Sequence, residues 1–173
     1  MTYLVVCGAP PARAIAELVK LLQDDGWEVC VIPTAAALAW LDSGAIERLT
    51  GHPVETHGRT PDEPKRLGEP ALVIVAPATF NTINKWALGI NDTPALGVLN
   101  EALGAGLPIV ASPYAKLSLS AHPAFDRSLA ELEGYGVRLT RTEALRPDRE
   151  DGPFQWSAVM HLVHEVRDPN GNR

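Results

Sequence analysis

The sequence predicts a single three-layer α/β domain, a Rossmann-like parallel sheet flanked by helices. Short apolar runs alternate along the chain with stretches in which apolar residues recur every three or four positions. Strands that alternate with helices of roughly 10–15 residues are typical of βαβ units and hence of a parallel sheet. The length of 173 residues fits about one domain. We expect this domain to span residues 1–167, with residues 168–173 as a disordered tail.

The strands are expected at the continuous apolar runs, a pattern typical of strands that are covered on both faces. In chain order these runs are Tyr3–Cys7, Trp27–Ile32, Leu72–Ala76, Leu107–Ala111 and Gly136–Leu139.

The helices are expected where apolar residues follow the helical period. Ile15, Leu18 and Leu22 form one such stripe, and Gly26 lies just beyond its end. The Ala-rich stretch Ala35–Leu41 predicts the start of a second helix, with Thr34 as its N-cap. Further helices are expected at Phe80–Leu88, Ala95–Ala105, Phe125–Leu132 and Trp156–Val166. The Gly- and Pro-rich stretch 50–70 predicts mostly loop.

Composition and charge exclude several functional classes. With 15 Lys and Arg against 21 Asp and Glu, the formal charge is −6. This acidic balance argues against duplex nucleic acid or an anionic membrane as partner, because both need a basic face. No apolar stretch reaches the ~18 residues of a membrane-spanning helix, and the first residues do not resemble a signal peptide. Cys7 and Cys30 lie inside apolar runs, so we expect buried, reduced thiols in a cytoplasmic protein.

The carboxyl ends of the expected strands are where ligands collect in an open parallel sheet. The segments at four of these ends are 8–11, 33–35, 77–82 and 112–116. The first lacks the three-glycine dinucleotide fingerprint, and no P-loop lysine follows any strand, which disfavours NAD(P) and ATP. Small hydroxyl side chains and backbone amides at helix starts remain, and these suit a single phosphate.

Residues 72–92 closely resemble the signature of the homo-oligomeric flavin-containing cysteine decarboxylases. That family includes phosphopantothenoylcysteine decarboxylase and the lantibiotic peptidyl-cysteine decarboxylases. Its Pro-Ala-Ser-Ala-Asn-Thr motif falls on 77–82, with four of six positions identical, and its Gly-x-x-Asp element falls on 89–92. Residues 33–37 resemble the family's phosphate-binding Ser/Thr turn, and 50–54 resemble its Ser-Gly-x-x-Val segment. The family's substrate clamp aligns without a gap on 113–124, where Lys116 replaces the clamp Asn.

The resemblance implies an FMN cofactor, whose flavin oxidises a substrate thiol towards a thioaldehyde before loss of CO2 gives an enethiol. The substrate would be a cysteine-containing small molecule or a peptide C-terminus. Because the family's flavin sits at a subunit contact, a homotrimer or an assembly of trimers is implied. The implied cofactor-binding residues are Gly8, Ala9, Thr34, Ala78, Thr79, Asn81 and Ser112, and the substrate-binding residues are Pro113 and Lys116.

The catalytic residues implied by the resemblance are Asn81 and a base. The family's catalytic His would fall at Glu63 or Pro64, so the base is missing from its usual place. His57 is the expected substitute, because a histidine pKa near ~6.5 suits proton transfer from a thiol better than a carboxylate does. Glu63 is the second choice.

Alternative interpretations stand beside these. The chain could bind a flavin without decarboxylase activity, as a regulatory or partner subunit, or belong to a related branch such as the flavin prenyltransferases. Thr34, Thr79 and Asn81 could be plain helix caps, and Lys116 a solvated charge. His122 is expected to orient the start of the next helix, and His52 to be a solvated loop residue. His161 and His164 are expected on an exposed helix face, and no metal site is expected.

Overall fold

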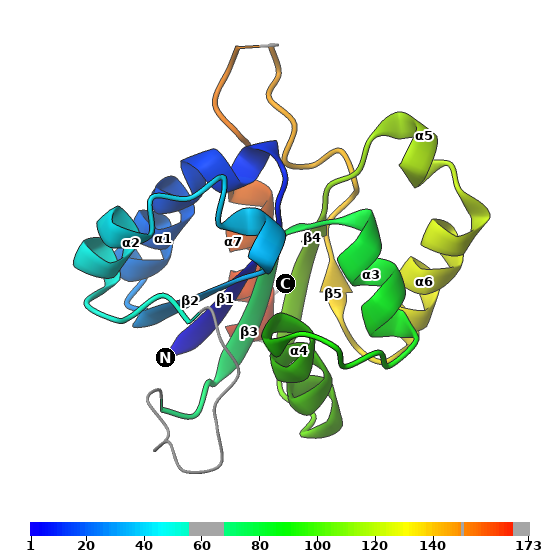
Figure 1. Ribbon diagram of the computed structural model, residues 1–173, viewed down its shortest axis with the longest axis horizontal. Helices are drawn as coiled ribbons and strands as arrows, with labels where there is room; N and C mark the ends of the chain where they lie inside the picture. Colours follow the sequence, from blue (N-terminus) through cyan, green and yellow to red (C-terminus); the bar gives the residue numbers. More distant parts are fainter. Residues whose placement is uncertain (56–67, 150, 168–173) are drawn as a thin grey trace.

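The computed structural model describes residues 1–55, 68–149 and 151–167. Within these residues five parallel strands form one sheet in the order β2-β1-β3-β4-β5 (Figure 1). They are β1 (Thr2–Val6), β2 (Val29–Pro33), β3 (Leu72–Ala78), β4 (Ile109–Pro113) and β5 (Arg138–Leu139). The predicted parallel sheet is confirmed, because each strand lies within two residues of the run expected for it.

Helices connect the strands and cover both faces of the sheet. They are α1 (Ile15–Asp24), α2 (Ser43–Thr50), α3 (Phe80–Ala87), α4 (Pro94–Gly104), α5 (Leu117–Ser120), α6 (Pro123–Gly134) and α7 (Ser157–Arg167), with two 3-10 turns, η1 (Pro10–Ala14) and η2 (Ala35–Ala37). Apolar residues of α1, α2 and α7 pack on one face, and those of α3, α4 and α6 pack on the other. This arrangement gives the three layers that the sequence predicts.

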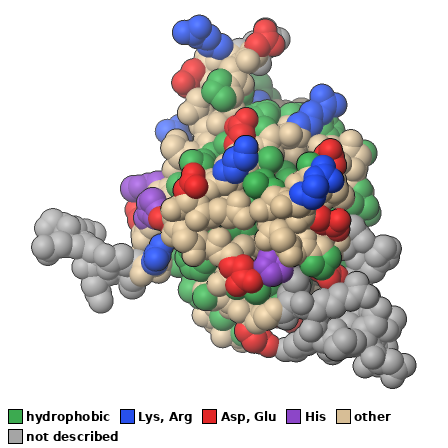
Figure 2. Space-filling model, turned by 90° about the vertical axis from the view of Figure 1, so that its left-hand side faces the viewer, with side chains coloured by type: hydrophobic (Ala, Val, Ile, Leu, Met, Phe, Trp, Pro, Cys, Tyr) green, Lys and Arg blue, Asp and Glu red, His purple; other side chains and the backbone are tan. Residues whose placement is uncertain are grey.

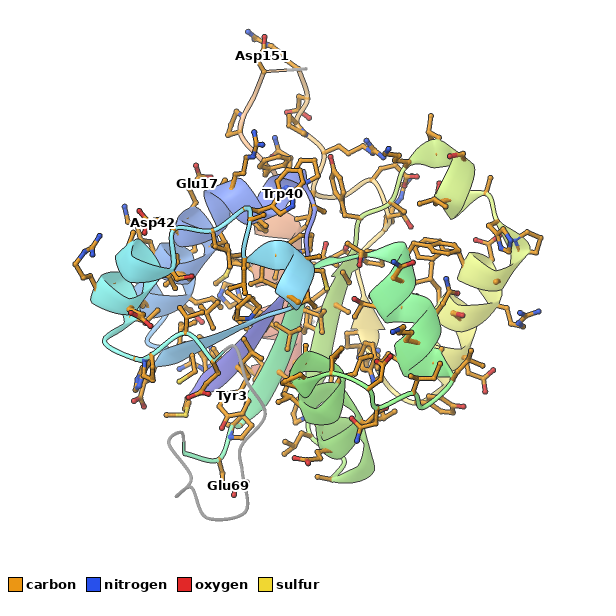
Figure 3. The ribbon with its side chains drawn as sticks, in the orientation of Figure 1. Tyr3, Glu17, Trp40, Asp42, Glu69 and Asp151 are labelled. Atoms are coloured by element: carbon orange, nitrogen blue, oxygen red, sulfur yellow. The ribbon has the colours of Figure 1, made fainter. Side chains whose placement is uncertain are left out.

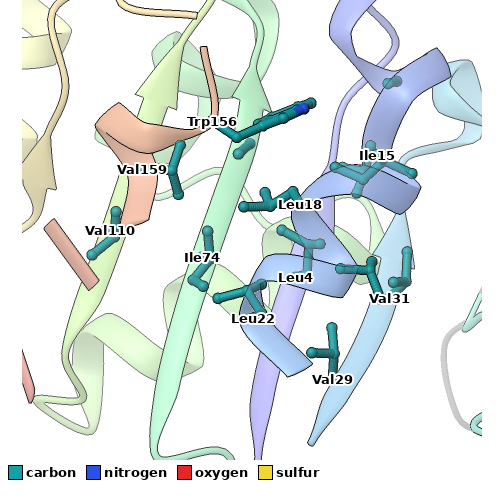
Figure 4. Packing of buried hydrophobic residues seen from close by; sticks show 14 of the residues in the cluster. Leu4, Ile15, Leu18, Leu22, Val29, Val31, Ile74, Val110, Trp156 and Val159 are labelled. Atoms are coloured by element: carbon teal, nitrogen blue, oxygen red, sulfur yellow. The ribbon is translucent and has the colours of Figure 1, made fainter. Parts of the chain in front are cut away.

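The strands supply alternate residues to the two layers of the core, as the pleat of a strand requires. Leu4 faces α1 and α7, whereas its neighbour Val5 faces the opposite layer. Figure 4 shows the first layer, in which Leu18 and Leu22 of α1 lie over Leu4 and Ile74. These side chains are fully buried, and burying one of this size contributes about 1.5–3 kcal/mol.

The helix expected at Ala35–Leu41 is the clearest error in the predicted elements. Only Ala35–Ala37 forms a single 3-10 turn, and α2 begins later, at Ser43. The Asp42 side chain accepts a hydrogen bond from the backbone N of Ala45 at 2.9 Å, so it caps the later helix. The guanidinium carbon of Arg13 lies over the Trp40 ring, 4.7 Å from the ring centroid. Capping and tertiary contact therefore outweigh the helical propensity of the alanines.

The two edges of the sheet carry different structures. At the carboxyl edge, uppermost in Figure 1, lie η1, η2 and the start of α3. An arm also rises there between β5 and α7, made of residues 145–149 and 151–155, and Figure 3 labels Asp151 on it. Tyr3 lies at the opposite, amino edge, where its hydroxyl donates to the Gly68 carbonyl at 2.6 Å.

Charges of both signs are interspersed over the described part of the face formed on the α1 and α2 side (Figure 2). This face carries no continuous basic patch of the kind that duplex nucleic acid requires. Among the described residues, no helix is both long enough and apolar enough to cross a bilayer.

Candidate functional site

The strand order reverses direction between β1 and β3, and this switch point defines the candidate site. From β1 the chain leads outward to β2, whereas β3 lies on the other side of β1 and leads to β4. The carboxyl ends of β1 and β3 are joined by a hydrogen bond from the Cys7 N to the Pro77 carbonyl at 3.1 Å. In open sheets of this topology ligands bind in the crevice outside such a switch point.

Gly8 allows the turns after β1 and β2 to meet at this point. A Cβ atom on Gly8 would lie 2.7 Å from the carbonyl oxygen of Ala36 and 2.8 Å from its carbonyl carbon. Both atoms belong to the backbone of η2, so they could not move aside as a flexible side chain would. The turn is also anchored by Thr34, whose N donates to the Val6 carbonyl at 2.8 Å. Glycine is therefore required here for close approach of the two backbones.

The helical turns that directly follow the strands start without side-chain caps. The side chain of the N-cap residue makes no capping hydrogen bond in η1 after β1, η2 after β2, α3 after β3 or α5 after β4. Three helices that start elsewhere are capped: Asp42, Thr93 and His122 accept hydrogen bonds at the starts of α2, α4 and α6. Thr34 and Thr79 hold the N-cap positions of η2 and α3, as expected, but their side chains do not make the capping hydrogen bond. The first-turn amides of η2 and α3 that bond no described residue remain available to an anion.

A chain of hydrogen bonds connects the core with the switch point. The buried Cys7 thiol donates to the Thr82 hydroxyl at 3.2 Å, and the hydroxyl oxygens of Thr82 and Thr79 lie 3.2 Å apart. Burial raises the pKa of the Cys7 thiol, and hydrogen bonds with Thr82 and Thr79 offset only part of this effect. The thiol is therefore protonated at neutral pH and acts as the donor. Thr82 can then donate to Thr79, so that Thr79 accepts this bond and keeps its own hydroxyl hydrogen as a donor.

Asn81 occupies the first turn of α3 at this edge. Its side chain is exposed and makes no hydrogen bond to any described residue, so it is not packed into the core. The preceding residue, Phe80, stacks on Phe125 with ring centroids 5.6 Å apart and meets the His122 ring edge-on at 5.7 Å. Phe80, which replaces the family's Ala, thus joins α3 to α6.

Ser112 and Pro113 close β4 and are both buried. Ser112 shares a 2.7 Å hydrogen bond with the Thr140 hydroxyl, which ties β4 to the segment after β5. Pro113 pairs with Ala78, and the next residue, Tyr114, donates its N to the Ala78 carbonyl at 2.8 Å. These contacts place the two residues beside the end of β3; their roles in cofactor and substrate binding stay predictions.

Lys116 stands beyond this pair as the N-cap residue of α5. Its side chain is exposed and forms no ion pair with any described residue. Its carbonyl accepts from the N atoms of Leu119 and Ser120 at 2.9 and 2.8 Å. The backbone is thus fixed, while the ammonium group is held by no residue that the structure describes.

Several histidines expected from the sequence lie away from this edge or have structural roles. His52 lies 2.8 Å from Glu28, which precedes β2 at the amino edge, so His52 is paired and remote from Asn81. The expectation for His122 is confirmed, because its Nδ1 accepts from the Ala124 N at 3.1 Å at the start of α6. His161 and His164 are exposed on α7, as expected, beside Glu165 and Asp25. His57 and Glu63 lie outside the described residues.

Sequence reasoning missed two contributors to this edge. Thr82 lies within the matched motif, and that match could have identified it as a partner of Thr79. Arg146, whose Nη2 donates to the Ala115 carbonyl, lies in no motif, and no local signal marks it.

Two hollows on the described surface lie elsewhere. One of about 530 Å³ is lined by the arm residues Asp148, Arg149, Asp151, Gly152, Pro153 and Gln155. The other, of about 450 Å³, lies between α1 and the arm, beside Glu17 and Trp156. Both are shaped by the arm, and neither includes Gly8, Thr79 or Asn81.

Comparison with known proteins finds a sequence relative of this chain and solved structures that share its fold. The chain is 31% identical over 172 residues to the coenzyme A biosynthesis bifunctional protein CoaBC of Thermococcus kodakarensis; the match covers 94% of this chain but 41% of that protein. The FMN-dependent cysteine decarboxylase SpaF superposes with a TM-score of 0.71 at 25% identity, over 94% of this chain and 95% of that one. The cypemycin decarboxylase CypD superposes with a TM-score of 0.75 at 20% identity, over 99% and 95%, which shows the shared fold.

The family itself is shown by a match to Flavoprotein over residues 2–168. Because this match covers nearly the whole chain, and the sheet has the order and strand-end site of a flavin-binding α/β fold, the chain belongs to the Flavoprotein family, which implies a flavin cofactor.

Proposed function

We propose that this protein binds FMN at the carboxyl edge of its sheet and decarboxylates a cysteine-containing substrate. The observation that carries the proposal is the β1–β3 switch point. Gly8 lies there against η2, and Thr34 and Thr79 begin η2 and α3 without capping them by their side chains. Similarity to an FMN-dependent cysteine decarboxylase supports the same choice. The curated relative named above is more than twice as long as this chain, so its full activity does not transfer with the match.

The residues at the switch point fit the phosphate end of FMN. Amides at the starts of η2 and α3 offer N–H donors, and helix starts favour anions. The start of η1 offers none, because its first two residues are Pro10 and Pro11. The Thr34 hydroxyl makes no hydrogen bond to a described residue, and the Thr79 hydroxyl has a hydrogen to donate. In this proposal Gly8, Ala9 and Ala78 approach the cofactor with their backbone atoms rather than with side chains.

Asn81 and Lys116 would act on the reacting end. A bound flavin would supply the chemistry of the reacting end, accepting two electrons as the cysteine side chain is oxidised to a thioaldehyde, so that the carboxylate could then leave as CO2. The Asn81 amide, exposed in the first turn of α3, donates hydrogen bonds to the acceptor edge of the ring or to the substrate. Lys116 pairs with the substrate carboxylate, in the role for which the family uses Asn. His57 takes the thiol proton, with Glu63 as the second choice.

We further propose that the active protein is a homotrimer or an assembly of trimers. A site formed by Asn81, Thr34 and Lys116 is open to solvent in one chain, and a neighbouring copy would cover it. The apolar side chains of Leu117 and Leu119 in α5 are 74% and 39% exposed at this edge, which suits such a contact. Light scattering at micromolar concentration tests this, and a monomer that still binds FMN would contradict it.

The experiment on function uses the purified protein and a peptide that ends in cysteine. We expect a yellow protein with flavin absorbance, and mass spectrometry that records loss of CO2 and two hydrogens from the peptide. Asn81→Asp should abolish turnover, because a carboxylate cannot donate where the amide does. His57→Asn should slow turnover strongly and Glu63→Gln only weakly. Turnover that survives both of these substitutions would overturn the assignment of the base.

The second candidate, flavin binding without decarboxylation, is favoured by one observation. His52, a second histidine in the stretch that also holds His57, is paired with Glu28 at the amino edge of the sheet and so does not replace the missing base. A protein that retains FMN but leaves every cysteine substrate intact would establish this alternative. A colourless protein that does not bind added FMN would contradict both.

A further inference from the structure

We infer that Arg146 is a positioning residue for Lys116: the arm uses its guanidinium to fix the segment 114–116 that follows β4. This inference rests on the proposed function, in which Lys116 meets the substrate carboxylate. Arg146 lies thirty residues along the chain from Lys116. Its side chain nevertheless reaches the peptide group that precedes Lys116.

The first contact is a hydrogen bond to the backbone. The Arg146 Nη2 donates to the Ala115 carbonyl oxygen at 2.7 Å, and Ala115 is buried. That carbonyl carbon is bonded directly to the N of Lys116, and the peptide group is planar. Fixing the Ala115 oxygen therefore fixes the orientation of the Lys116 N and Cα.

The second contact holds the neighbouring ring. The Arg146 guanidinium lies over the Tyr114 ring, 5.1 Å from its centroid. Phe154, on the returning side of the arm, meets the same ring edge-on with centroids 6.5 Å apart. Tyr114 is thus held by two residues of the arm, and a planar guanidinium can stack and donate at the same time.

The base of the arm is anchored in the core, so the arm can hold Arg146 in a fixed position. Leu145, next to Arg146, is fully buried among the residues of the α1 and α7 layer. Its carbonyl accepts from the Gln155 N at 3.3 Å, which closes the base of the arm. The Arg146 N also donates to the Glu143 carbonyl at 2.9 Å.

The remaining anchors of the segment are backbone bonds on either side of it. The Tyr114 N bonds to the Ala78 carbonyl, and the Lys116 carbonyl accepts from the first amides available in α5. Among the described residues, Arg146 is the side chain that bonds the backbone between these two anchors. Its substitution can therefore loosen Lys116 without touching the switch point on β1 and β3.

The test compares wild type with Arg146→Ala, Arg146→Lys and the matched control Arg149→Ala, which removes an exposed arginine of the same arm. Hydrogen exchange is measured at the amides of Tyr114, Leu119 and Ser120, which bond across the segment. We expect about tenfold faster exchange in Arg146→Ala, on the order of the loss of a hydrogen bond from a charged donor. Arg146→Lys should give an intermediate rate, and Arg149→Ala the wild-type rate.

Kinetics then test the route through Lys116. Arg146→Ala should raise KM for the cysteine-ended peptide while FMN affinity stays at the wild-type value. Lys116→Ala should raise KM as well, and adding Arg146→Ala to it should cause no further increase, because a residue that acts through another adds nothing once that residue is gone. Additive effects would overturn the inference.

The outcomes separate this inference from the proposed function. If wild type neither binds FMN nor releases CO2, the proposed function fails, and the exchange rates alone decide whether Arg146 positions the segment. If wild type is active and Arg146→Ala matches Arg149→Ala in both exchange and KM, the inference fails and the proposed function stands. Circular dichroism of Arg146→Ala and Arg146→Lys checks that both fold, and the lysine variant keeps the test valid if the alanine variant does not.

Discussion

Gly8 is the residue on which the close contact of the first two strand-end turns depends. Gly8→Ala would place a Cβ atom 2.7 Å from the backbone oxygen of Ala36. Overpacking of this kind costs about 1–3 kcal/mol, so we expect a lower free energy of unfolding and weaker FMN binding. Gly104→Ala is the matched control: beyond its own helix backbone and chain neighbours, no heavy atom of a described residue lies within 4 Å of the added Cβ, and the residue ends α4. Urea denaturation of both variants measures the difference, and equal stability of Gly8→Ala and wild type would contradict the packing argument.

At the scale of elements, a pair of polar side chains joins α3 to α6. The buried Ser128 donates to the Asn84 side-chain oxygen at 2.7 Å, and the Asn84 amide donates to the Phe80 carbonyl at 2.9 Å. We expect Ser128→Ala to cost roughly 1 kcal/mol of unfolding free energy, because a buried hydrogen bond is lost and its acceptor is left unpaired. Thermal denaturation measures it, with Ser118→Ala of the exposed α5 as control. If both variants have the same melting temperature, the hydrogen bond between Ser128 and Asn84 contributes nothing to stability.

At the scale of the whole molecule, buried weak acids make stability fall at high pH. Burial raises the pKa of Cys30 from 9.0 to about 11 and, with nearby negative charges, that of Tyr3 from 10.0 to about 12. The unfolded chain therefore releases these protons at lower pH than the folded chain does. Between pH 9 and 12 the unfolded state binds fewer protons, so its free energy falls relative to the folded state.

Denaturation by urea at a series of pH values checks this expectation. The free energy of unfolding should decrease steadily above pH 9 in wild type. Cys30→Val should flatten the decrease between pH 9 and 11, because valine fills the same apolar site without titrating. A wild-type profile that is level over this range would show that neither group is shifted.

The sequence by itself determined the strands, most of the helices and the edge at which the site lies. Apolar runs and helical stripes are local signals, set by the burial of neighbouring positions in one element. The motif 77–82 directly follows the most apolar run, so its place at the carboxyl end of β3 was predictable. The predicted helix at Ala35–Leu41 is wrong because its signal was only local. The Asp42 cap and the contact of Trp40 with Arg13 outweigh the helical propensity of the alanines.

Tertiary structure decided which of the candidate residues meet. Only the strand order brings Gly8 against Ala36 and Cys7 against Thr82, because these contacts join segments that no local period relates. Tertiary structure also places His52 at the amino edge, away from Asn81. The sequence could not decide this, because a residue in the connection between β2 and β3 can lie at either edge of the sheet. Arg146 is the extreme case: its contact with Ala115 depends on how the arm folds back over the end of β4, and a pattern read along the chain carries no trace of that return.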